Sequence, residues 1–175
     1  MLAGSLPEAP GLSAALLARR AAGERIAIDS SGASLPALVD EVRPDLLKVN
    51  VAEAAELTGR EGDAAGLDAA ALAAALHERT GGTAVVTDGA AGAVAVDAAG
   101  AWRALPDPNS GAYGIGSGDS FFAGLLAALA ADASVPEGLR AASAAGSANT
   151  RAPGAGVFTR ADVDAALARI EVREL

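Results

Sequence analysis

Short runs of strand-forming residues alternate with helical patterns along the first half of the chain. The expected elements there are a strand at 25–29, a helix ending near 42, a strand at 46–49, a helix at 51–57, a helix at 67–80 and a strand at 83–87. Such alternation is typical of a mostly parallel sheet with helices on both faces. The sequence therefore predicts an α/β fold, and no boundary divides residues 1–175 into more than one domain.

The second half mixes turns, one hairpin and three helices. A glycine-containing loop joins the run at 83–87 to a second strand-like run at 93–97, and a hairpin turn follows at 98–100. Residues 106–113 are rich in turn formers, so we expect a loop there. Helices are expected at 118–131, 136–149 and 160–170.

Composition excludes several classes of function. The net charge of −9 argues against nucleic acid or anionic lipid as a partner, although backbone N–H groups can still hold a phosphate locally. The absence of cysteine excludes a disulfide framework, a thiolate nucleophile and a zinc–thiolate site. Because the sequence shows neither a membrane-spanning apolar run nor a signal peptide, we expect a cytoplasmic protein with no membrane partner.

The stretch 114–124, GIGSGDSFFAG, places alternating glycines directly before an acidic residue and an apolar helix. Glycines let backbone N–H groups turn inward, and a helix N-terminus adds partial positive charge, so this turn is suited to an anion. Asp119 beside it could accept a proton from a hydroxyl that attacks a bound phosphoryl group. The alternative is a capped helix in which Ser117 or Asp119 satisfies first-turn N–H groups. A Walker A loop is excluded, because no Gly-Lys-Ser/Thr sequence follows.

This segment resembles the G-[AS]-G-D signature of the PfkB, ribokinase-like carbohydrate kinases, and is most similar to the 1-phosphofructokinase and tagatose-6-phosphate kinase branch. The resemblance implies a three-layer α/β/α fold and ATP-dependent transfer of the γ-phosphoryl group to a sugar or sugar phosphate, with Mg²⁺. It assigns Asp119 as the catalytic base and the N–H groups of Gly116, Ser117 and Gly118 to an anion hole.

Other segments match the same family in the same order. Lys48, Asn50 and Glu53 match K-x-N-x-x-E, which the resemblance links to nucleotide phosphate and, through Glu53, to the metal. The residues alone explain this motif equally well as an Asn N-cap with Glu53 at the third helical position. The turn Gly4-Ser5-Leu6-Pro7 resembles the family's G-S-L-P turn.

Two further segments are expected to contact the nucleotide. Thr87, Gly89 and Gly92 match the family's T-x-G-x-x-G, although an ordinary tight loop between two strands also accounts for them. Asn149 and Val157 fall where the family's adenine pocket lies, although a helix end before Pro153 is an alternative explanation.

The resemblance runs from about residue 2 to 157 and covers only the C-terminal, nucleotide-binding half of such kinases. We therefore expect the N-terminal strands, the lid and most of the sugar site to be missing. An exposed strand edge near 2–4 or 25–29 would then favour a homo-oligomer. The runner-up hypothesis is a non-catalytic nucleotide-binding or oligomer-forming fragment.

Overall fold

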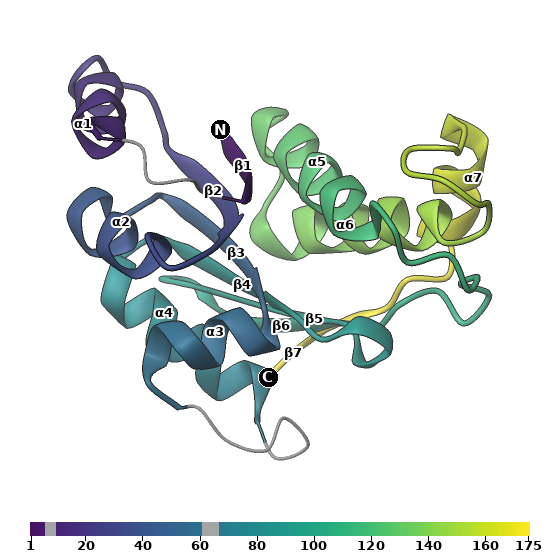
Figure 1. Ribbon diagram of the computed structural model, residues 1–175. Coiled ribbons are helices and arrows are strands. Elements are labelled where there is room, and N and C mark those ends of the chain that lie inside the picture. The colour runs from purple at the N-terminus through teal and green to yellow at the C-terminus, as the bar shows by residue number, and fades with distance from the viewer. Residues whose placement is uncertain (6–9, 61–66) are drawn as a thin grey trace. The chain divides into compact units, whose positions relative to one another are not determined.

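The computed structural model describes residues 1–5, 10–60 and 67–175, and its strands form one mixed sheet in which they follow one another in chain order (Figure 1). The strands are β1 (Leu2–Ser5), β2 (Ala27–Ser31), β3 (Leu46–Asn50), β4 (Thr83–Thr87), β5 (Ala93–Asp97), β6 (Gly100–Ala104) and β7 (Val172–Glu174). Neighbours from β1 to β4 pair in parallel, whereas β6 and β7 are antiparallel. The predicted α/β fold class is confirmed.

Helices separate the parallel strands, as the alternating sequence pattern predicts. They are α1 (Leu12–Ala21), α2 (Leu35–Val42), α3 (Val51–Thr58), α4 (Ala69–Thr80), α5 (Ser117–Ala130), α6 (Val135–Asn149) and α7 (Arg160–Leu167), together with the short 3₁₀ helix η2 (Gly89–Ala91). Within the described ranges, no helix is both long enough and apolar enough to cross a bilayer. The polar, glycine-containing loop that the sequence predicts at 61–66 lies outside the described residues.

The described residues form two compact units. The first contains Met1–Thr87 and Val96–Ala101, and the second contains Asp88–Ala95 and Trp102–Leu175. Each unit has its own apolar core.

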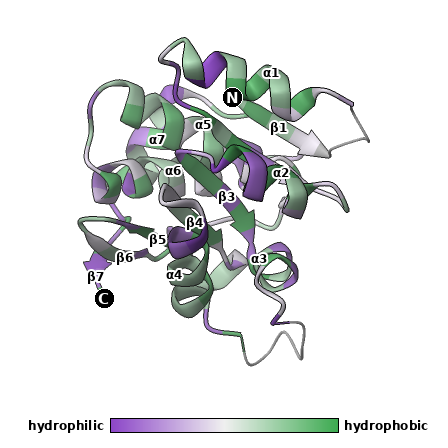
Figure 2. Ribbon diagram, turned by 90° about the vertical axis from the view of Figure 1, so that its left-hand side faces the viewer, coloured by the Kyte–Doolittle hydropathy of each residue, from purple (hydrophilic) through white to green (hydrophobic). Residues whose placement is uncertain are grey.

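The core of the first unit is centred on β3. Leu46, Leu47 and Val49 are almost completely buried, which is the pattern of a parallel strand covered on both faces, and Figure 2 colours β3 mainly hydrophobic. Arg79, near the end of α4, links the surrounding helices by hydrogen bonds. Its guanidinium donates to both carboxylate oxygens of Asp40 on α2, at 2.6 and 2.8 Å, and to the Leu57 carbonyl on α3.

The second unit is built on a close helix pair, α5 and α6. Glycines make this approach possible: a Cβ at Gly124 would lie 3.0 Å from the Ala145 Cβ, and one at Gly146 would lie 3.2 Å from the Ser117 carbonyl oxygen. Bulkier residues would push the helices apart. The small residues of α6 therefore fix the position at which α5 begins.

The C-terminal segment differs from the prediction. The sequence predicts a helix from 160 to 170, but α7 ends at Leu167 and the chain continues into β7 beside β6. A strand of three residues is too short to give a periodic signal. The early end of α7 brings Arg169 to the loop after β6.

Candidate active site

The glycine-rich segment before α5 forms a tight turn in the second unit. Gly116 is the N-cap residue and has the left-handed backbone conformation, with φ 78°, which glycine adopts without steric cost. Ser117 and Gly118 follow as the first two helical residues, and Asp119 is the third. The Asp119 residue is exposed, whereas Ser120 beside it is buried. The turn therefore presents one carboxylate to solvent at the start of an apolar helix.

The hydrogen bonds of this turn leave several donors free. Both the N–H and the hydroxyl of Ser117 donate to the Gly114 carbonyl, at 3.1 and 2.7 Å. Within the part of the chain that the structure describes, the N–H groups of Gly116, Gly118 and Asp119 have no acceptor. Free first-turn N–H groups and the helix dipole together favour an anion.

The capped-helix alternative is not what the structure shows. No side chain caps the N-terminus of α5, because the Ser117 hydroxyl bonds back to Gly114 and does not reach the first-turn N–H groups. Of the three residues that the family resemblance assigns to an anion hole, Gly116 and Gly118 have N–H groups available in this conformation, and that of Ser117 is occupied.

Asn149, at the end of α6, lies beneath this turn and is fully buried. Its amide nitrogen donates to the Ile115 carbonyl at 2.8 Å, and its amide oxygen accepts from the Gly156 N–H at 2.7 Å. The Ser120 hydroxyl also contacts that oxygen, at 3.3 Å. All of these partners belong to the protein, so the carboxamide holds the turn together. Val157, the other residue expected near adenine, is 54% exposed.

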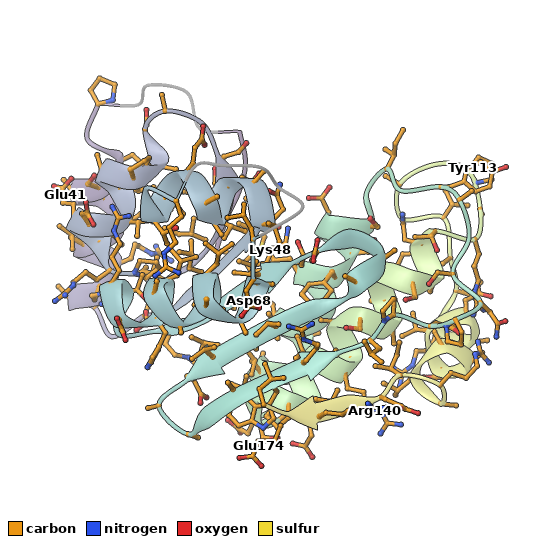
Figure 3. The ribbon with its side chains drawn as sticks, turned by 90° about the horizontal axis from the view of Figure 1, so that it is seen from below. Glu41, Lys48, Asp68, Tyr113, Arg140 and Glu174 are labelled. Atoms are coloured by element: carbon orange, nitrogen blue, oxygen red, sulfur yellow. The ribbon has the colours of Figure 1, made fainter. Side chains whose placement is uncertain are left out.

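A second group of expected residues lies in the first unit. Lys48 on β3, labelled in Figure 3, is buried and donates to both oxygens of Asp29 on β2, at 2.9 and 3.0 Å. These two residues are register partners in the parallel pair. The ammonium group is thus held at a fixed place in the sheet by a part-buried carboxylate.

Asn50 and Glu53 form a capping box at the start of α3. The Asn50 side-chain oxygen accepts from the Glu53 N–H at 2.9 Å, and a Glu53 carboxylate oxygen accepts from the Asn50 N–H at 2.8 Å. The structural explanation of this motif is therefore confirmed, and it leaves the metal assignment open. Asn50 is also the register partner of Thr87, so the ends of β3 and β4 place these residues side by side.

Glu53 fits a limited metal role. Its second carboxylate oxygen is free of hydrogen bonds among the described residues, and proteins commonly bind Mg²⁺ through one or two carboxylates together with substrate phosphates and water. No cluster of three or more potential metal ligands occurs in the described ranges. Glu53 could therefore contribute to a Mg²⁺–nucleotide complex, but it could not hold the ion without the phosphates.

The loop after β4 has two glycines with different environments. A Cβ at Gly92 would lie 2.1 Å from the Ala104 carbonyl oxygen, so glycine is required there by the backbone of β6. A Cβ at Gly89 would meet open space, which leaves that position accessible to a ligand. The Thr87 hydroxyl makes a long contact, 3.4 Å, with the Val49 carbonyl. Of the turn at 4–7, Leu6 and Pro7 lie outside the described residues.

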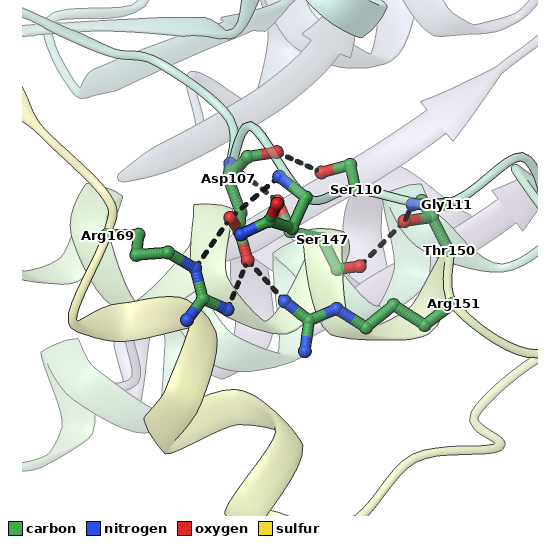
Figure 4. Close-up of polar contacts among 8 residues, drawn as sticks. Asp107, Ser110, Gly111, Ser147, Thr150, Arg151 and Arg169 are labelled. Carbon is green, nitrogen blue, oxygen red and sulfur yellow. Dashed lines mark hydrogen bonds and ion pairs between the residues drawn. The ribbon is translucent and has the colours of Figure 1, made fainter.

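A buried charge cluster in the second unit is not evident from the sequence. The side chain of Asp107 is inaccessible to solvent and accepts from Arg169 at 2.8 and 2.9 Å and from Arg151 (Figure 4). The hydrogen bonds from Arg169 lower the pKa of Asp107 to about 2. The segment 106–113 is rich in turn formers, and nothing in the sequence pattern distinguishes this aspartate from an exposed one.

Hydrogen bonds around this cluster hold the loop at 106–113, which precedes the glycine-rich turn, against the end of α6. The Ser147 hydroxyl accepts from the Asp107 N–H at 3.2 Å, and the Thr150 hydroxyl accepts from the Gly111 N–H at 2.8 Å. The Thr150 carbonyl accepts from the Tyr113 N–H at 3.1 Å. The loop thus runs along the end of α6 up to the turn that begins α5.

Comparison with known proteins identifies the family of this chain. The family model described as pfkB family carbohydrate kinase matches residues 2–161. The chain belongs to the pfkB family. This confirms the resemblance inferred from the glycine-rich turn and its aspartate.

Individual relatives are named phosphofructokinases. The chain is 39% identical to the 1-phosphofructokinase of Rhodobacter capsulatus over 148 residues, which cover 82% of this chain and 46% of that relative. It is 32% identical to the ATP-dependent 6-phosphofructokinase isozyme 2 of Escherichia coli over 155 residues, which cover 86% of this chain and 50% of that relative.

Solved structures give the same picture. The phosphofructokinase-2 of Escherichia coli, crystallised in complex with potassium, superposes with a TM-score of 0.83 and 28% identity. The matched region covers 95% of this chain and 55% of that one. This pfkB-family chain therefore spans about half the length of the relatives that it matches.

Proposed function

We propose that this chain is the nucleotide-binding and catalytic-base part of an ATP-dependent carbohydrate kinase. The reaction is transfer of the ATP γ-phosphoryl group to a hydroxyl of a sugar or sugar phosphate, such as fructose 1-phosphate or tagatose 6-phosphate. The observation that carries the proposal is the start of α5 in a pfkB-family chain, where the N–H groups of Gly116, Gly118 and Asp119 are free and Asp119 carries an exposed carboxylate.

These groups suit the two requirements of phosphoryl transfer. The Asp119 carboxylate accepts the proton of the attacking sugar hydroxyl while the new oxygen–phosphorus bond forms and the bond from the γ-phosphorus to the β-phosphate oxygen breaks. The N–H groups at the helix start stabilise the negative charge on the transferring group. Mg²⁺, when bound to the nucleotide, supplies further charge neutralisation, and Glu53 is the residue that would contact it.

Similar proteins support the nucleotide and the type of acceptor. One relative is named as ATP-dependent, and both relatives are named as phosphofructokinases. A structure of the Escherichia coli phosphofructokinase-2 is described as a tetrameric inhibited form, which supports our expectation of a homo-oligomer. We also propose a cytoplasmic location, as expected for a kinase of sugar metabolism.

Asp119→Asn tests the proposal directly. The variant should keep its affinity for ADP and lose turnover, because the carboxylate acts on the acceptor hydroxyl and not on the nucleotide. The matched control is Asp132→Asn, an exposed aspartate just past the C-terminal end of α5 with φ 60°, a conformation that asparagine also adopts. ADP release would be followed with fructose 1-phosphate, fructose 6-phosphate and tagatose 6-phosphate as acceptors.

The outcomes separate this proposal from its alternative. Turnover that survives in Asp119→Asn would refute the assignment of the base. Because this chain spans about half the length of its relatives, turnover is measured with the N-terminal half of a relative supplied. ADP binding without turnover under those conditions would favour the non-catalytic nucleotide-binding or oligomer-forming fragment. If the chain bound neither ADP nor sulfate, both the kinase proposal and the fragment alternative would be refuted.

A further inference from the structure

We infer that Asn149 is a positioning residue that aims the Gly116 N–H toward the transferred phosphoryl group. This inference rests on the proposed function and adds to it a residue that does not touch the substrate. It replaces the expectation that Asn149 itself contacts the nucleotide, because the carboxamide of Asn149 already has protein partners on both its nitrogen and its oxygen.

A single peptide group determines the direction of the Gly116 N–H. The bond between Ile115 and Gly116 is trans, so the Ile115 carbonyl and the Gly116 N–H point in opposite directions. Asn149 donates to that carbonyl at 2.8 Å and is completely buried. The carbonyl therefore points into the protein, and the N–H of the same peptide group points away from Asn149.

Close packing against the next loop fixes the same peptide from another side. A Cβ placed on Gly116 would lie 2.5 Å from the Ala155 Cβ and 3.6 Å from the Asn149 amide oxygen. That amide oxygen in turn accepts from the Gly156 N–H at 2.7 Å. Asn149 thus links the turn before α5 to the loop after α6, and neither can shift without straining one of its hydrogen bonds to Asn149.

The consequence concerns the set of donors. The Gly118 and Asp119 N–H groups point along the axis of α5 as part of its first turn, whereas the direction of the Gly116 N–H depends on the turn alone. Asn149 is the side chain that sets this direction. A donor oriented before the substrate arrives costs no reorganisation during the reaction, which is the basis of oxyanion-hole stabilisation.

The first experiment uses the unaltered chain with sulfate as the anion. In ¹⁵N-resolved spectra, the amide signals of Gly116, Gly118 and Asp119 should all shift with one common sulfate affinity. If Gly118 and Asp119 respond but Gly116 does not, the inference is wrong and the proposed function stands. If none of the three responds, the anion site of the proposed function is itself refuted.

The second experiment uses Asn149→Asp, which keeps an oxygen for the Gly156 N–H and loses the donor to Ile115. Sulfate affinity should fall about tenfold or more, the value of one hydrogen bond to a charged group, and the Gly116 amide should stop responding. The Gly156 amide signal should stay near its original position. If Asn149 served only to hold the loop after α6, the Gly116 amide signal of the variant would still shift with sulfate.

Two control variants separate positioning from charge and from packing. Asn109→Asp adds the same charge at an exposed position in the loop before the turn, and it should bind sulfate within about twofold of the original chain. Ser120→Ala removes one contact of Asn149 but leaves the bond to Ile115, so the Gly116 amide should still respond. Equal weakening in Asn109→Asp and Asn149→Asp would overturn the inference. If Asn149→Asp does not fold, the titration of the unaltered chain can still refute the inference.

Discussion

The Asp107 cluster makes a strong stability prediction because a fully buried carboxylate meets two arginines there. Arg169 donates to both of its oxygens and Arg151 donates to one, and the resulting pKa of Asp107 is about 2. Each pKa unit corresponds to about 1.4 kcal/mol, so the lowered pKa represents roughly 2 kcal/mol of folding free energy at neutral pH. Asp107→Asn should lower the free energy of unfolding by about that amount or slightly more, because both guanidinium groups lose their carboxylate.

The pH dependence has a definite sign. The pKa of Asp107 is lower in the folded chain than in the unfolded chain, so the unfolded chain takes up the proton first as the pH falls. The stabilisation is therefore complete above about pH 5, falls to roughly half near pH 3, and disappears as the pH drops below about 2. The difference in unfolding free energy between the original chain and Asp107→Asn should shrink accordingly.

Urea unfolding at pH 7 and near pH 3 measures both effects. Trp102 is the only tryptophan and belongs to the same compact unit as Asp107, so its fluorescence reports unfolding of that unit. Asp132→Asn, at an exposed site, is the control and should match the original chain at both pH values. The reasoning would be refuted if Asp107→Asn differed from the original chain by less than about 0.5 kcal/mol at pH 7, or by the same amount at both pH values.

Two local substitutions give further tests by thermal or urea unfolding. Gly92→Ala should destabilise the chain by about 2 kcal/mol or more, because φ at Gly92 is 96° and the new Cβ would overlap the Ala104 carbonyl. Gly89→Ala is the control, and it should cost clearly less because a Cβ there meets open space. Equal losses of stability in the two variants would contradict the packing argument. Asn50→Ala should lower the free energy of unfolding by about 1 kcal/mol, because the capping box on α3 is lost. Asn109→Ala, at an exposed loop site, is the control and should change stability little. An unaltered unfolding midpoint for Asn50→Ala would show that the cap contributes nothing.

The sequence predicts most of the fold because its signals are local. Asn50 before an apolar run, with Glu53 three residues later, marks the start of α3, and Gly59 in the left-handed conformation ends it. The strand runs at 83–87 and 93–97 agree with β4 and β5. The strand β7 escaped prediction because its three residues pair only with a distant strand, β6.

The site is less predictable because its contacts join residues far apart in the chain. Asn149 meets Ile115 across 34 residues, and Arg169 meets Asp107 across 62. A single sequence places Asn149 at a helix end but does not show which carbonyl it binds. Likewise, Lys48 could be identified as the only lysine, yet its part-buried pairing with Asp29 depends on the register of β2 and β3.

The outer edge of β1 leads to the last prediction. Among the described strands, β1 lies at the end of the sheet and pairs with β2 alone, which agrees with the expected exposed edge near residues 2–4 (Figure 1). Met1, Ala3 and Gly4 are exposed, and α1 in the same unit buries none of its residues. An unpaired strand edge with little covering recruits another strand, so we expect self-association that increases with concentration.

Ala3→Lys should weaken that association, because a charge on an edge strand opposes pairing with a second chain. Ala14→Lys adds the same charge at an exposed position of α1 and is the matched control. Sedimentation velocity over a range of concentrations should show a smaller associated fraction for Ala3→Lys than for either the original chain or Ala14→Lys. An original chain that is monomeric at every concentration would contradict the prediction. Equal weakening by both lysines would mean that net charge governs association and that the edge of β1 does not.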